Sequence, residues 1–253
     1  MKSLKQNDPV QYTRIYSLGA SRGSSAVTND EIAGPIESSD EWIRQRTGIV
    51  TRVRAPEGQS LMDMAVEASK EAIEKSGIDP SEIDAVILAT ISFPYATPSG
   101  ATMLAAEVGA GDAAAYDISA ACAGYCYGIA QADALIRSGN SKYVLVVGGE
   151  KLSDFILPTD RSISFLLGDG AGAAIVGPSD HSGISKTVWG SDGANWDKVG
   201  MTGSILDFRD GKTEWPTLVQ EGQPVFRWAV WEMVKVAKEA LEASGLAPED
   251  LSA

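Results

Sequence analysis

Residues 85–91 read Ala85-Val86-Ile87-Leu88-Ala89-Thr90-Ile91, an unbroken and mainly apolar run that is rich in β-branched side chains. A second run, Tyr143-Val144-Leu145-Val146-Val147, has the same character. Apolar runs without alternating polar residues are typical of strands that are covered on both faces. Helical patterns over residues 99–108 and 123–138 lie between the two runs. This order of strands and helices predicts an α/β fold with a mainly parallel sheet between helices.

The segments around this centre supply further elements. Residues 60–76 have helical periodicity that ends at Gly77, with an apolar face made of Leu61, Ala65, Ala68, Ala72 and Ile73. Weaker patterns predict strands at 15–18, 168–176 and 184–190, a capped helix that starts near Ser38, and a long helix over 225–244. The stretch at 177–183 is rich in Pro, Gly and Asp. We therefore expect one domain over residues 1–178 and the beginning of a second over residues 179–253.

Composition excludes several classes of protein. The formal net charge of -13 argues against general affinity for nucleic acid. No apolar run is long enough to cross a membrane, and the first residues lack the apolar core of a secretory signal, so we expect a cytoplasmic protein. The two cysteines, Cys122 and Cys126, give neither a disulfide framework nor the paired spacing of a zinc site. No metal and no cofactor are implied.

The segment with the most chemical information is Tyr116-Asp-Ile-Ser-Ala-Ala-Cys122-Ala-Gly-Tyr-Cys-Tyr-Gly128. It reads as a strand that ends in small residues and turns into a helix with Cys122 in its first turn. The positive end of a helix dipole favours the thiolate form of a cysteine, and small neighbours let a substrate approach. The alternative is that Cys122 is a small buried core residue, which we expect for Cys126.

Four segments together resemble the β-ketoacyl-acyl carrier protein synthase III family of the thiolase-like superfamily. They are Asp117–Tyr125, which holds Cys122, and three others in the same order as in that family: Ser38–Gly48, Asp160–Ala173 and Gln220–Arg227. The resemblance covers nearly the whole chain. It implies a duplicated five-layer α-β-α-β-α sandwich, of which this chain holds the first half and an incomplete second half.

The resemblance also implies an activity. In that family, a cysteine takes an acyl group from acyl-coenzyme A, and malonyl-acyl carrier protein is then decarboxylated so that its carbanion attacks the new thioester. Cys122 matches the nucleophile, and its backbone N–H would contribute to the oxyanion hole. The family implies a homodimeric acyltransferase of fatty acid synthesis.

Other residues match the family's binding positions. Trp42 matches the residue that stacks on the adenine of coenzyme A, with Arg161 on the other face of the adenine, although a helix-capping Trp and a surface Arg would read the same. Positions that line the coenzyme A channel are matched by Ser38, Arg46, Leu166, Leu167, Gly222 and Phe226. Thr97 falls where the family closes the acyl pocket, and its small side chain indicates longer or branched starter groups. Arg227 matches a position for docking the carrier protein.

The family's decarboxylation step uses a His and an Asn. The single histidine, His181, lies in a turn-like sequence, so we expect it to be exposed, and the family's histidine motif would begin beyond Ala253. We therefore expect that this chain alone cannot condense and that it exposes apolar surface and a sheet edge.

Three alternatives remain open at this stage. A thiolase or hydroxymethylglutaryl-coenzyme A synthase would share the cysteine chemistry, and a non-catalytic scaffold subunit would share the fold. A nucleotide-binding protein ranks last, because Gly168-Asp-Gly-Ala-Gly172 lacks the Lys of a P-loop and indicates tight strand packing instead.

Overall fold

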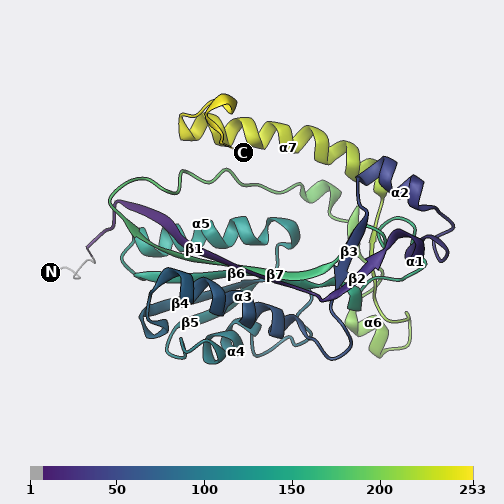
Figure 1. Cartoon of the computed structure of the whole chain (residues 1–253), viewed down its shortest axis with the longest axis horizontal. Helices are drawn as coiled ribbons and strands as arrows, with labels where there is room; N and C mark the ends of the chain where they lie inside the picture. The colour runs from purple at the N-terminus through teal and green to yellow at the C-terminus, as the bar shows by residue number, and fades with distance from the viewer. Residues whose placement is uncertain (1–7, 253) are drawn as a thin grey trace. The chain divides into compact units, whose positions relative to one another are not determined.

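The computed structural model describes residues 8–252 (Figure 1). Its strands are β1 (Tyr12–Arg22), β2 (Ser25–Thr28), β3 (Thr51–Arg54), β4 (Ile83–Ala89), β5 (Ala114–Ile118), β6 (Tyr143–Lys151), β7 (Asp169–Ser179), β8 (Val199–Met201) and β9 (Leu218–Gln220). Its α-helices are α1 (Asn29–Ala33), α2 (Asp40–Thr47), α3 (Leu61–Ser76), α4 (Gly100–Glu107), α5 (Gly124–Arg137), α6 (Ile205–Arg209) and α7 (Gly222–Ser244). Short 3₁₀ turns occur at Pro80–Glu82, Ala121–Ala123, Leu152–Asp154, Gly193–Asn195 and Pro248–Asp250.

The chain forms two compact units that interleave along the sequence. The first comprises the residues up to Ser24 together with 55–151 and 169–185, and the second comprises 25–54, 152–168 and the residues from Lys186 onward. The division that we expected at residue 178 separates the two duplicated halves of the fold, which are not the same as these compact units. That division stays a prediction.

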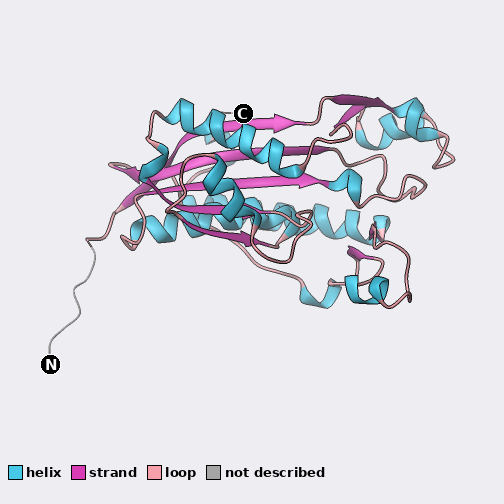
Figure 2. Cartoon of the chain, turned by 90° about the horizontal axis from the view of Figure 1, so that it is seen from below, coloured by secondary structure: helices cyan, strands magenta, loops and turns pink. Residues whose placement is uncertain are grey.

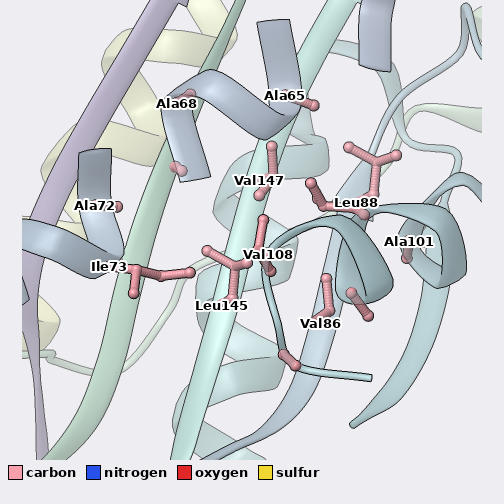
Figure 3. Close-up of a cluster of buried hydrophobic side chains, with 14 of the residues drawn as sticks. Ala65, Ala68, Ala72, Ile73, Val86, Leu88, Ala101, Val108, Leu145 and Val147 are labelled. Atoms are coloured by element: carbon pink, nitrogen blue, oxygen red, sulfur yellow. The ribbon is translucent and has the colours of Figure 1, made fainter. Parts of the chain in front are cut away.

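The first unit is built on a five-stranded sheet with the strand order β1-β7-β6-β4-β5. Figure 2 shows strands in magenta that lie side by side. Helix α5 covers one face of this sheet, and α3 and α4 cover the other (Figure 1). Successive residues of one strand therefore enter different cores. Val86 and Leu88 pack with the alanines of α3, as Figure 3 shows, whereas Ala85 and Ile87 pack with α5. The unbroken apolar run at 85–91 is explained by these two covered faces, and the predicted α/β class is confirmed.

The expectation of a mainly parallel sheet is only half right. Strand β4 is parallel to both β5 and β6, but β7 is antiparallel to β6 and to β1. The crossover connections between β4, β5 and β6 contain helices α4 and α5, whereas no α-helix lies between β6 and β7. Parallel neighbours need such a crossover, so β7 returns in the opposite direction.

The second unit carries short elements. Strands β2 and β3 form one antiparallel pair and β8 and β9 form another. Its buried clusters are small; one contains Ile32, Ile36, Ile43 and Phe165. The strand predicted at 184–190 is wrong, because these residues have no regular structure and join none of the sheets within residues 8–252.

The long C-terminal helix is present as predicted, and it starts at Gly222 instead of Val225. None of its side chains is buried, and Phe226, Trp228, Trp231 and Met233 are among the exposed apolar residues. The expectation of exposed apolar surface is thus confirmed for this helix. Within residues 8–252, no helix combines the length and the apolar character that a membrane span requires.

Candidate active site

Cys122 lies in the turn that joins β5 to α5. The turn runs through a short 3₁₀ segment, Ala121–Ala123, and α5 begins at Gly124. The preceding residue, Ala121, has a φ of 44°, which is rarely adopted by residues other than glycine. Such backbone costs about 1–3 kcal/mol and concentrates at functional sites. Cys122 is exposed, so it is not the buried core residue that the alternative interpretation required.

Cys126 departs from expectation. We predicted that it is a buried core residue, but it is exposed as well. The reason is the orientation of α5: its buried positions are Gly124, Gly128, Ala130, Ala132 and Ile136, and Cys126 lies outside this face. The chain therefore offers two accessible thiols one helical turn apart, which any labelling experiment must separate.

Two glycines allow α5 to lie directly on the sheet beneath the cysteine turn. A Cβ atom on Gly128 would lie 2.6 Å from Cγ1 of Val146, and one on Gly124 would lie 2.9 Å from Cβ of Ala89. Tyr125 covers the backbone of Gly148 in the same contact, and burial raises the pKa of its phenol. The small residues that we noted in the segment thus allow α5, which begins two residues after Cys122, to lie close to the sheet.

The carboxyl ends of the parallel strands bring further polar groups to the same edge of the sheet as Cys122. Thr97 is exposed in the connection that follows β4. That connection is held at both ends. The backbone N–H of Ile91 donates to Glu150 over 2.9 Å, and the N–H groups of Gly100 and Ala101 each donate to Asp117 over 2.8 Å.

Sequence reasoning missed Glu150 and Asp117 as parts of this edge. Asp117 stands inside the quoted cysteine segment, but its function as a cap for α4 depends on a partner 17 residues away. Nothing in the sequence indicated that Glu150 belongs to this edge, because charged residues commonly follow an apolar run where a strand ends. Only the pairing of β4 with β6 brings it to the loop after β4.

The second unit contains the residues predicted to bind the adenine of coenzyme A. Ser39 caps α2 by accepting a hydrogen bond from the Trp42 N–H over 3.1 Å. The guanidinium carbons of Arg46 and Arg161 lie 4.5 Å and 4.8 Å from the centre of the Trp42 ring. Phe165 contacts the ring edge-on, with 5.4 Å between ring centres. An indole and two guanidinium planes together can hold a flat, anionic ligand such as a nucleotide.

The other predicted channel residues fall into two groups. Leu166 packs in the cluster that contains Trp42, and Ser38 precedes α2 with a buried hydroxyl that has no partner among residues 8–252. Leu167 packs in a different cluster, with Ile156, Ile163 and Leu218.

Gly222, Phe226 and Arg227 are exposed on the first turns of α7, with Phe226 at 68% exposure. Thus Trp42, Arg46, Arg161 and Leu166 are brought together, and the residues of α7 are not part of their cluster.

His181 is exposed, as predicted. Its Nδ1 lies 2.6 Å from an oxygen of Asp180, and this contact is the first cause of the lowered pKa of that carboxyl group. Gly168 lies so close to β3 that a Cβ atom there would be 2.6 Å from the carbonyl oxygen of Val53. This close approach agrees with a packing function for the glycine-rich segment.

Comparison with known proteins identifies the family. A model of the 3-oxoacyl-[acyl-carrier-protein] synthase III family matches residues 116–193. Over its whole length the chain is 55% identical to β-ketoacyl-[acyl-carrier-protein] synthase III of Kocuria rhizophila, and it covers 78% of that protein. The corresponding protein 1 of Streptomyces coelicolor is 44% identical over 99% of the chain and 76% of its own length.

Solved structures agree with this assignment. The priming β-ketosynthase of the R1128 polyketide pathway matches with a TM-score of 0.94 at 41% identity, over 99% of this chain and 75% of that one. The synthase III of Aquifex aeolicus matches with a TM-score of 0.84 at 35% identity, over 95% of this chain and 74% of that one. These neighbours have the thiolase-like fold, and the relatives' names favour a synthase III over a thiolase or hydroxymethylglutaryl-coenzyme A synthase. The chain belongs to the β-ketoacyl-[acyl-carrier-protein] synthase III family of condensing acyltransferases.

Proposed function

We propose that this chain initiates fatty acid synthesis by accepting an acyl group from acyl-coenzyme A on Cys122. The thiolate of Cys122 attacks the thioester carbonyl carbon, the bond from that carbon to the coenzyme A sulfur breaks, and coenzyme A leaves as a thiolate that takes a proton. For this chain by itself we propose only this acylation step, because its single histidine, His181, is exposed and lies against Asp180. In the family, the acyl group is then condensed with malonyl-acyl carrier protein. Loss of carbon dioxide leaves a carbanion equivalent that attacks the acyl thioester and releases the Cys122 thiolate.

The observation that carries this proposal is the position of Cys122. It is an exposed thiol beside the N-terminus of a 14-residue helix, and it follows a residue in a left-handed conformation. A helix N-terminus stabilises negative charge both on the thiolate and on the oxyanion that forms during attack. The backbone N–H of Cys122 is our candidate oxyanion donor.

The indole and guanidinium groups of Trp42 and Arg161 support coenzyme A as the acyl carrier. Ser38, Arg46, Leu166, Leu167, Gly222 and Phe226 are the proposed remainder of its channel. Arg227 is exposed, as a docking residue for an acidic carrier protein must be. A cytoplasmic homodimer without a resident cofactor completes the proposal, and the homodimer follows from the family alone.

Intact-mass measurement after incubation with acyl-coenzyme A tests this function. We expect one acyl adduct on the wild-type chain, none on Cys122→Ser, and an unchanged adduct on Cys126→Ser, which controls for the second exposed thiol. Acylation of Cys122→Ser to the wild-type level would reject Cys122 as the nucleophile. The same measurement with a panel of acyl-coenzyme A starters tests the prediction that the small side chain of Thr97 leaves space for longer or branched acyl groups. A marked preference for acetyl- over branched acyl-coenzyme A would contradict it.

A further inference from the structure

Two arginines of β3 hold consecutive backbone carbonyls of the segment that carries Arg161. Nη2 of Arg52 donates to the carbonyl oxygen of Phe165 over 3.0 Å, and Nη2 of Arg54 donates to that of Ser164 over 3.0 Å. Arg52 is buried, with 6% of its surface exposed. Residues 160–167 contain little regular structure, so these side-chain bonds fix a backbone that secondary structure does not.

The same guanidinium also bonds β2 and the first residue of α1. Nη2 of Arg52 donates to Oδ1 of Asn29 over 2.6 Å, and Nη1 donates to the carbonyl oxygen of Val27 over 3.2 Å. Asn29, which is 1% exposed, donates in turn through Nδ2 to Oδ1 of Asp40 and to the carbonyl oxygen of Ile49, each over 2.8 Å. Asp40 is the first residue of α2, two positions before Trp42.

The chemistry of Arg52 points to a geometric function. Within residues 8–252 its hydrogen-bond acceptors are the neutral oxygens of Val27, Asn29 and Phe165, and burial is the main cause of its lowered pKa. Burying a guanidinium without a carboxylate partner contributes little to stability, and an apolar side chain of similar volume would fill the space at lower cost. The planar fork of Arg, however, fixes several acceptors at defined angles, which Lys cannot do.

We propose that Arg52 is a positioning residue for the coenzyme A site, which sets the spacing between Trp42 and Arg161. In one direction the hydrogen bonds run through Asn29 to Asp40, two positions before Trp42. In the other direction they reach the carbonyl group of Phe165. The Phe165 ring contacts Trp42 edge-on, and its segment also contains Arg161. This inference rests on the proposed function, because it assumes that Trp42 and Arg161 hold the adenine. It adds a buried residue that touches no substrate.

The test compares Arg52→Lys with the wild-type chain in acylation of Cys122 by two donors. Acyl-coenzyme A carries the adenine nucleotide, and acyl-pantetheine lacks it. For acyl-coenzyme A we expect the KM of Arg52→Lys to rise about tenfold, which corresponds to the free energy of about one hydrogen bond that involves a charged group. The rate at saturation should be nearly unchanged. For acyl-pantetheine we expect the KM to stay at the wild-type value. Arg14→Lys, a substitution in the first unit, is the control and should change neither value.

Asp40→Ala is the second variant, in case Arg52→Lys folds poorly, because it cuts the network at its partly exposed end. It should show the same loss confined to acyl-coenzyme A. An equal rise in KM for both donors would reduce Arg52 to a general structural residue, and an unchanged KM for acyl-coenzyme A in both variants would overturn the inference. Failure of the wild-type chain to acylate would instead reject the proposed function.

Discussion

Glu150 is a partly buried carboxylate that holds the loop after β4. It accepts hydrogen bonds from the Ile91 N–H over 2.9 Å, from Oγ1 of Thr90 over 3.2 Å, and from Oγ of Ser92. Burial raises its pKa, against the opposing effect of these donors. The folded chain therefore binds this proton more tightly than the unfolded chain. Because Glu150 holds the loop that carries Thr97, the free energy of unfolding should depend on pH through this carboxyl group.

The variant Glu150→Gln should reveal this linkage. The unfolded carboxyl group titrates near pH 4.5, and the folded group titrates at higher pH. Its contribution to the free energy of unfolding is complete below pH 4.5 and is lost as pH rises through the folded pKa. We expect the stability advantage of the wild type over Glu150→Gln to be largest at acid pH and to fall as pH rises. Urea denaturation of both proteins across this range measures the difference, and a difference that grows with pH would contradict the argument.

The position of helix α5 depends on two glycines, Gly124 and Gly128, which have no side chain and so let the helix lie close to the sheet. The Cβ atom of Gly128→Ala would lie 2.6 Å from Cγ1 of Val146, which is fully buried and cannot move aside. Ala gains about 1 kcal/mol in helix propensity over Gly, whereas overpacking a core costs about 1–3 kcal/mol. We expect overpacking to dominate, with a net loss of up to about 2 kcal/mol in urea denaturation. Gly111→Ala is the control, because it meets open space and should stay within about 0.5 kcal/mol of the wild type.

The same variant should affect Cys122, because any displacement of α5 moves the turn that carries it. We expect slower acylation of Cys122 in Gly128→Ala and an unchanged rate in Gly111→Ala. A Gly128→Ala protein as stable as the wild type would show that the helix can shift without cost.

Elements with a strong local pattern could be predicted from the sequence, and elements that depend on distant partners could not. The helix over 61–76 has a clear apolar face, a serine cap at Ser60 and a left-handed Gly77, and it was predicted almost to the residue. The direction of β7 depends on what lies between β6 and β7, and apolar periodicity does not report direction. Residues 184–190 have the composition of a strand, but strand structure requires a neighbouring strand to pair with.

The candidate site divides in the same way. Motif resemblance indicated Cys122, Trp42 and Arg161, because these side chains stand in recognisable local segments. It did not indicate Asn29, Arg52 or Glu150, whose partners lie in other elements. The sequence shows that such a residue is polar, but it does not show that the residue is buried or which groups it bonds. Its function is therefore recognised only in the folded structure.

At the scale of the whole molecule, buried apolar side chains are distributed unevenly. The large clusters on both faces of the five-stranded sheet belong to the first unit, whereas the clusters described in the second unit are small. Helix α7 has 23 residues and buries none of them, with Trp231 at 76% exposure. Most of the stability of a helix in a protein comes from packing of an apolar face, so α7 should open more easily than shorter, buried helices.

Hydrogen exchange tests this expectation directly. Amides of α7 should exchange faster than those of α3, which has 16 residues and buries seven of them, and faster than those of β6 in the centre of the sheet. Peptide-level exchange followed by mass spectrometry at several protein concentrations measures this order. Protection of α7 that equals that of α3 in dilute solution would contradict its exposure in this structure. Protection that appears only at high concentration would mean that a second copy of the chain covers Trp231 and its neighbours, because only an intermolecular contact depends on concentration.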